Sequence, residues 1–188
     1  ISNSKSREIV HAMRNRVSGI MVGVDTIIKD NPKLTTRLPD EGVDAIRIIV
    51  DTHLRIPLDS HVLKHQSNKI TIIATTELAD ANKFQEIQKF SGVQLAEMPL
   101  KSGRVDLAYL IAWLGKKGID SILVEGGATL NFSMLNEGLI DKVVAFIAPK
   151  ILGGTEAKTP VTGLGFEWIS DAIVLKDMRL TNVDEDIM

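Results

Sequence analysis

The chain has 188 residues, 44% of them hydrophobic, and a mean hydropathy of +0.10, which predicts one soluble globular domain with a single core. Its formal charge of −2 and pI near 6.1 give no general attraction to nucleic acid or to an anionic membrane, so we expect neither as a partner. The absence of cysteine excludes disulfides, thiolate catalysis and cysteine-ligated zinc, and it fits a reducing compartment such as the cytoplasm.

The two ends of the chain suggest a piece of a longer protein. The first residue is Ile1 rather than methionine, and the polar residues after it resemble neither a signal peptide nor a transit sequence. The other end, at Met188, falls where a last strand is expected. We therefore expect residues 1–188 to form a single domain that is truncated at both ends.

Strand and helix patterns alternate along the chain. Apolar residues from Ile9 to Val17 recur at helical spacing behind possible caps at Ser2 and Ser4, which predicts an opening helix. Helical spacing also predicts helices over residues 79–90, 107–118 and 130–136. Short apolar or β-branched runs predict strands over residues 20–24, 46–50, 70–74, 93–96, 122–125 and 143–148.

This alternation predicts a three-layer α/β/α domain around a mostly parallel sheet. Residues 173–183 alternate loosely between apolar and polar side chains, so we expect them to form antiparallel strands at the sheet edge. Glycines at positions 153–154 and 163–165 predict loops after the strand at 143–148. On its apolar helix, Trp113 is expected in the core, whereas Trp168 suits either an interface or internal packing.

The most informative stretch is residues 123–130, where an apolar run ends in Glu125 and two glycines before a helix. Gly126 and Gly127 allow positive φ and close approach of a ligand, and the free N–H groups of a helix start favour phosphate. At a strand end, Glu125 could accept hydrogen bonds from hydroxyl groups. The alternative is an ordinary turn, because the spacing does not match the G-x-G-x-x-G fingerprint of dinucleotide-binding proteins.

Two more predicted strands end in polar residues, and we expect all three strand ends to meet at one crevice. The first is followed by Asp30 and then Arg37, whose guanidinium could hold a phosphate by paired hydrogen bonds. The second is followed by Asp51 and Thr52. Each has a simpler alternative: Asp30 capping a turn, Arg37 in a surface ion pair, and Asp51 or Thr52 ending a strand.

The four histidines do not predict a metal site or a hydrolase. His61 and His65 have i, i+4 spacing, but no glutamate lies between them and no third ligand is evident, so we expect surface histidines. No G-x-S-x-G motif occurs, and neither His11 nor His53 has a nucleophile signature nearby.

Four segments, residues 20–35, 48–52, 124–130 and 147–154, resemble in the same order the reductase domain of the bacterial bifunctional riboflavin-biosynthesis deaminase/reductase. The resemblance covers nearly the whole chain and implies a dihydrofolate-reductase-like fold, which agrees with the α/β pattern. It implies NADPH-dependent reduction of 5-amino-6-(5-phosphoribosylamino)uracil to its phosphoribitylamino counterpart. It also implies a cytoplasmic homodimer whose full-length chain carries a zinc deaminase domain. The deaminase signature, H-x-E followed by P-C-x-x-C, is absent here.

The resemblance also assigns site residues at the matching positions. It implies substrate contacts from Leu34, Arg37 and Glu125, with Arg37 on the ribose 5-phosphate and Glu125 as the catalytic residue that orients the open-chain sugar. The implied cofactor contacts are Thr26, Asp30, Thr52, Gly127, Ala128, Thr129, Leu130, Asn131, Phe132 and Ser133. Since the hydride comes from NADPH, neither a protein nucleophile nor a metal is needed.

Some questions stay open at the level of sequence. The basic partner of the NADPH 2′-phosphate could be Lys29, Arg37, Arg55 or Lys150. Two other functions compete with the riboflavin-pathway reaction. One is reduction of another pterin-like or folate-like substrate on the same fold, and the other is a non-catalytic nucleotide-binding or dimerising module.

Overall fold

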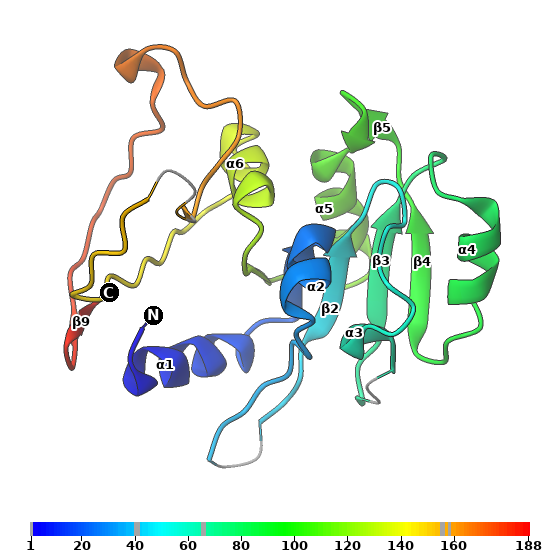
Figure 1. Cartoon of the computed structure of the whole chain (residues 1–188), viewed down its shortest axis with the longest axis horizontal. Helices are drawn as coiled ribbons and strands as arrows, with labels where there is room; N and C mark the ends of the chain where they lie inside the picture. The colour runs from blue at the N-terminus through cyan, green and yellow to red at the C-terminus, as the bar shows by residue number, and fades with distance from the viewer. Residues whose placement is uncertain (1, 40–41, 65–66, 155–156, 158) are drawn as a thin grey trace.

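A five-stranded parallel sheet forms the centre of the computed structural model, which describes residues 2–39, 42–64, 67–154, 157 and 159–188 (Figure 1). The strand order is β4-β3-β2-β1-β7. The strands are β1 (Gly19–Gly23), β2 (Ile46–Val50), β3 (Thr71–Thr75), β4 (Val93–Glu97) and β7 (Ile122–Val124). Since β1 pairs in parallel with both β2 and β7, the last strand of the sheet lies beside the first.

Helices cover both faces of the sheet and complete the predicted three layers. One face packs against α2 (Val24–Asp30), α3 (His61–Lys64) and α4 (Ala81–Ile87), and the other packs against α5 (Leu107–Lys116) and α6 (Ala128–Asn136). Alternate strand residues supply the two cores; Ile49 faces the first set of helices and Ile48 the second. The predicted α/β/α fold class is confirmed. None of the described helices has the length and apolar character needed to cross a membrane.

Capping residues fix the helix starts more sharply than the apolar periodicity indicated. Helix α1 (Ser4–Arg14) is capped by Asn3, whose side chain accepts from the Ser6 amide, so the expected caps at Ser2 and Ser4 are wrong. Asp80 caps α4 and Asp106 caps α5 in the same way. The cap at Asp80 makes α4 begin later than the predicted helix over residues 79–90, and α4 also ends earlier, at Ile87.

The segment after α6 differs most from the expectation. Residues 143–148 form no strand; only Ile147 makes a β-bridge, to Ile187. Residues 173–181 also lack strand structure, and the short β8 (Asn182–Val183) and β9 (Asp186–Ile187) pair with each other rather than with the central sheet. A β-branched run becomes a strand only where another backbone supplies hydrogen bonds, and this part of the chain runs away from the sheet (Figure 1).

The C-terminal arm, residues 143–188, is tethered to the start of α1. The Asp186 carboxylate accepts hydrogen bonds from the Ser6 hydroxyl at 2.6 Å and from the Asn3 amide at 2.8 Å, and these bonds lower the pKa of Asp186. Along the arm Trp168 is 65% exposed, so it does not pack internally in this chain. Trp113, on α5, instead packs at the edge of the core, with the Lys117 ammonium over its ring.

Candidate active site

A cavity of about 770 Å³ opens where β1, β2 and β7 end. Its walls come from α2, the loop after β2, the hairpin of β5 (Leu100–Lys101) and β6 (Arg104–Val105), the start of α6, and the arm at Ala157, Thr159 and Thr162. The volume falls within the range of about 300–1,000 Å³ found for ligand pockets. The three strand ends singled out in the sequence therefore do line one crevice.

The two glycines after Glu125 shape one wall of this cavity. Gly126 and Gly127 have φ values of +89° and +85°, a backbone conformation that favours glycine. A Cβ on Gly127 would lie 3.5 Å from the Gly23 amide nitrogen and 3.6 Å from the Thr26 hydroxyl. Gly127 is also the N-cap of α6 and has no side chain to bond the first N–H groups of the helix. The turn thus leaves backbone donors available to a ligand.

Most of the predicted cofactor contacts meet in this cavity. The residues lining it include Thr26, Asp30, Thr52, Gly127, Ala128, Thr129, Leu130 and Ser133. The structure does not bring Asn131 and Phe132 into it. The Asn131 side chain donates to the Pro160 carbonyl at 2.8 Å, and the Phe132 ring packs against Phe166 with ring centroids 5.7 Å apart. Helical geometry accounts for this, since residues 127–133 cover nearly two turns and cannot all face one side.

Basic side chains also line the cavity. Lys29, Arg55 and Arg104 all contribute to its wall, whereas Arg37 and Lys150 do not. Arg55 forms an ion pair with Asp25, Nη2 to Oδ1 at 2.8 Å, so part of its charge is already matched. Arg104, which no sequence motif marks, reaches the cavity from the β5–β6 hairpin.

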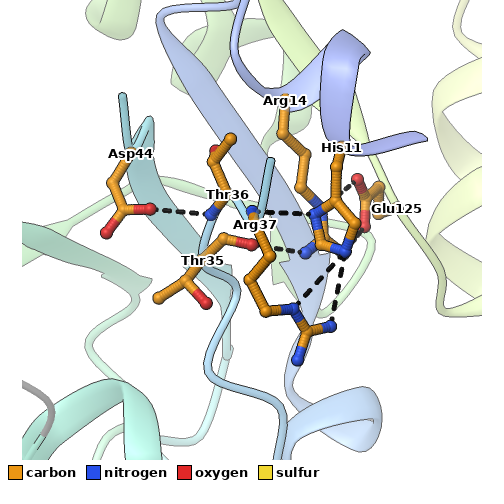
Figure 2. Close-up of polar contacts among 7 residues, drawn as sticks. All are labelled: His11, Arg14, Thr35, Thr36, Arg37, Asp44 and Glu125. Atoms are coloured by element: carbon orange, nitrogen blue, oxygen red, sulfur yellow. Dashed lines mark hydrogen bonds and ion pairs between the residues drawn. The ribbon is translucent and has the colours of Figure 1, made fainter. Parts of the chain in front are cut away.

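A second polar cluster adjoins the cavity through Glu125, two residues before Gly127. The Glu125 amide donates to the Met21 carbonyl at 2.9 Å, which fixes its backbone against β1. Its carboxylate forms a paired salt bridge with Arg14, Nε to Oε1 at 2.7 Å and Nη2 to Oε2 (Figure 2). Arg14 Nη1 also donates to the Thr35 carbonyl at 2.8 Å. The two side chains are 14% and 17% exposed, so the pair is largely shielded from water.

Arg37 lies on the other side of Arg14, against the ring of His11 (Figure 2). Asp44 holds the loop before Arg37 by accepting from the Thr36 amide at 2.7 Å and from the Ser67 hydroxyl at 2.9 Å. Partial burial, followed by the positive charges of Arg14 and Arg37, lowers the pKa of His11. Arg37 itself is exposed, and so it remains accessible to a ligand.

Leu34 contributes to the core rather than to an open surface. Its side chain is 4% exposed and packs with the apolar cluster beneath α2, and its φ is +53°. Any substrate contact at this position would therefore involve the backbone.

Sequence reasoning missed Arg14 and His11. Both lie on α1 three residues apart, a spacing that puts them on the same face of the helix. In the sequence, this spacing is the feature that indicates a shared role for His11 and Arg14.

Asp51 and His61 have structural positions, whereas His53 lines the cavity. The buried Asp51 carboxylate accepts from the Ile56 amide at 2.8 Å and turns the loop after β2; burial raises its pKa. His61 is exposed and contacts Asn31, while His65 lies outside the described residues. Within the described part of the chain, no group of three His, Cys, Asp or Glu side chains could hold a metal ion.

Comparison with known proteins places this architecture in a family. The chain is 40% identical over 190 residues to the riboflavin biosynthesis protein RibD of Actinobacillus pleuropneumoniae and covers 49% of it. It is 37% identical over 190 residues to the 2,5-diamino-6-ribosylamino-4(3H)-pyrimidinone 5′-phosphate reductase of Methanothermobacter thermautotrophicus and covers 85% of it. In both comparisons all of this chain is matched.

A solved structure of Acinetobacter baumannii RibD superposes on the whole chain with a TM-score of 0.80 at 28% identity, and 50% of that protein is covered. The chain thus spans about half the length of the RibD proteins it matches. The dihydrofolate-reductase-like fold expected from the sequence motifs is confirmed by this neighbour. The family model described as the RibD C-terminal domain matches residues 1–188, and the chain belongs to that family.

Proposed function

We propose that this chain is an NADPH-dependent reductase of riboflavin biosynthesis that converts 5-amino-6-(5-phosphoribosylamino)uracil to 5-amino-6-(5-phosphoribitylamino)uracil. One observation carries the proposal: in a member of the RibD C-terminal domain family, a nucleotide-sized cavity adjoins a cluster of Arg14, Arg37 and Glu125. The cavity suits a phosphate-bearing cofactor, and the cluster suits a phosphorylated sugar.

The residues of the cavity fit a nicotinamide dinucleotide. The space beside Gly127 that a Cβ would fill, together with the first N–H groups of α6, suits a cofactor phosphate. Thr26, Asp30 and Thr52 offer hydroxyl and carboxylate groups for ribose hydroxyls. When bound, NADPH would supply a hydride from nicotinamide C4. Lys29, Arg55 and Arg104 support NADPH over NADH, because a 2′-phosphate requires a basic partner.

On the substrate side, we assign Arg37 to the 5-phosphate and Glu125 to the hydroxyls of the open-chain sugar. The Arg14 salt bridge positions the Glu125 carboxylate, and both of its oxygens can still accept further hydrogen bonds. Accurate placement of the reacting carbon is most of what the protein must contribute to a hydride transfer.

A second candidate substrate is 2,5-diamino-6-ribosylamino-4(3H)-pyrimidinone 5′-phosphate. The supporting observation is the 37% identity to the Methanothermobacter thermautotrophicus reductase, 85% of which this chain covers. The two pyrimidines differ at one ring substituent and carry the same phosphorylated sugar. A pterin-like or folate-like substrate is less well supported, because it would leave Arg37 without a phosphate to bind.

The test is oxidation of NADPH by the full-length protein, followed by absorbance with each pyrimidine in turn. We expect substrate-dependent oxidation, faster with the uracil compound, and a slower rate for Glu125→Gln with NADPH affinity unchanged. Faster oxidation with the diamino compound would select the second candidate. NADPH binding without oxidation by either compound would contradict both and favour a non-catalytic nucleotide-binding module.

Three further expectations belong to the whole protein: a deaminase domain in the full-length chain, a homodimer, and a cytoplasmic location. The half-length match to RibD proteins supports the first. The exposed apolar side chains of the C-terminal arm, Trp168 among them, support an association partner. Sedimentation of the full-length protein would determine the oligomeric state.

A further inference from the structure

The His11 ring meets Arg37 at both of its nitrogens (Figure 2). The Arg37 backbone N–H points at Nδ1 over 3.2 Å, and the Arg37 side-chain Nε and Nη2 each lie 3.4 Å from Nε2. Every one of these Arg37 groups is a hydrogen-bond donor. A neutral imidazole, however, has one nitrogen that accepts and one that carries a proton.

One of the two contacts therefore joins two donors. The backbone amide is the shorter contact and is held in place by the loop, so Nδ1 is the accepting nitrogen and Nε2 carries the proton. The Arg37 guanidinium then faces an N–H group rather than a lone pair. Without an acceptor between them, these two groups repel each other, and the exposed guanidinium is free to turn away.

An anion between the two groups would remove this conflict, since its oxygens only accept. Arg14, the nearest other cation, is already committed: its three nitrogens donate to the two Glu125 oxygens and to the Thr35 carbonyl. Glu125 is itself an anion and would oppose a second one close to it. Arg14 keeps two further N–H groups, but its charge is paired with Glu125, so His11 Nε2 and the Arg37 guanidinium are the donors left to pair with a second anion.

We propose that His11 is a second ligand of the substrate phosphate, its Nε2–H and the Arg37 guanidinium donating together to the phosphate oxygens. This inference rests on the proposed function, which assigns the phosphate to Arg37 alone. Tetrahedral phosphate presents several acceptor oxygens and can bridge donors that are only 3.4 Å apart. His11 acts here as a binding residue through its N–H and need not be charged.

The charged groups around the His11 ring allow a second test of this proposal, through the pKa of His11. In the free protein partial burial, and then the charges of Arg14 and Arg37, lower the pKa of His11, while Glu125 acts in the opposite direction. A phosphate dianion beside Nε2 would favour the protonated imidazolium. Binding should therefore raise the pKa of His11, an effect that a purely structural histidine would not show.

The experiment measures the affinity of ribose 5-phosphate and of ribose by calorimetry, and the His11 ring titration by NMR. We expect the wild-type protein to prefer the phosphorylated sugar and the His11 pKa to rise on binding it. His11→Phe should lose about tenfold in affinity for ribose 5-phosphate, the value of one hydrogen bond to a charged group, with ribose affinity unchanged. His11→Gln, which keeps a side-chain N–H donor, should retain most of the affinity.

The matched control is His61→Phe, which removes an exposed imidazole from α3. It should bind like the wild type. Unchanged affinity in His11→Phe together with a fixed His11 pKa, while Arg37→Ala loses binding, would overturn the role of His11 and leave the phosphate at Arg37. Wild-type protein with no preference for the phosphorylated sugar would overturn the phosphate site itself. If His11→Phe does not fold, the His11→Gln affinity and the wild-type NMR titration decide the question.

Discussion

The salt bridge between Arg14 and Glu125 offers the sharpest test of how the site is held together. Arg14→Met keeps most of the apolar stem of the side chain but removes the guanidinium and its three donor nitrogens. It thereby breaks two bonds to Glu125 and one to the Thr35 carbonyl, and it leaves a largely buried carboxylate without its partner.

The burial of the Arg14–Glu125 pair determines how much stability we expect Arg14→Met to lose. Exposed ion pairs contribute about 0–1 kcal/mol, whereas removing one partner of a fully buried pair costs about 3–5 kcal/mol. At 14% and 17% exposure this pair lies between these limits, nearer the buried one. We expect Arg14→Met to lower the free energy of unfolding by about 2–3 kcal/mol, which is a shift of about 4–12 °C in Tm for a domain of this size. Glu125→Gln, which keeps one accepting oxygen, should cost about 1–2 kcal/mol.

A double-mutant cycle by urea denaturation separates this interaction from other effects. The double variant should lose less stability than the two single variants lose together. The difference, which is the coupling energy of the pair, should be about 1–2 kcal/mol. Arg16→Met is the control, because Arg16 is exposed just beyond the same helix, and its loss should change stability by no more than about 0.5 kcal/mol. Additive losses in the cycle would refute the reasoning.

Three other substitutions have expected outcomes. Arg104→Ala should weaken the binding of NADPH but not of NADH in fluorescence titrations, with Arg179→Ala on the arm as control; equal losses for both cofactors would refute the 2′-phosphate assignment. Gly127→Ala and Gly138→Ala should each lose about 1–2 kcal/mol because both glycines have positive φ, but only Gly127→Ala, where a Cβ approaches Gly23, should also weaken NADPH binding. Asp186 has a lowered pKa in the folded state, so its stabilising contribution is present above the unfolded value of about 3.9 and is lost as the pH falls through the folded value. The Tm difference between wild type and Asp186→Asn should therefore shrink on acidification from pH 7 to about 3, and a constant difference would contradict the assignment.

The strands of the central sheet could be predicted because their sequence carries the signal locally. Apart from the buried Arg47, Ile46–Val50 consists of β-branched side chains, and the predicted and observed bounds agree. The same reasoning failed for residues 143–148, which have similar side chains. A parallel strand in the middle of a sheet has two neighbours that define it, but the described segment 143–148 has only the Ile147–Ile187 bridge. Composition shows what a segment can form and does not show which backbone lies beside it.

The cavity at the strand ends was also largely predictable, because in a parallel sheet all carboxyl ends meet at one edge. Thr26, Thr52 and Gly127 each follow a different strand, and they line the same space. The cofactor contact at Phe132 stays a prediction, although the structure leaves this residue out of the cavity lining. The resemblance implies contacts from every residue of a continuous stretch, but successive residues of a helix face different directions. Leu130 therefore faces the cavity, whereas Phe132, two positions later, faces the arm.

The cluster of Arg14, Arg37 and Glu125 depends on strand order, which no local pattern contains. Arg14 precedes the first strand and Glu125 follows the last, 111 positions away along the chain. They meet because β7 pairs with β1, in the register that sets Val124 opposite Met21 and directs the Glu125 amide to the Met21 carbonyl. Residues before β1 and residues after β7 lie at opposite ends of two parallel strands, so the contact also needs α1, which brings Arg14 to the carboxyl end of β7. A polar pair such as His11 and Arg14 on the helix before a first strand therefore belongs among the candidate site residues, even when no motif marks it.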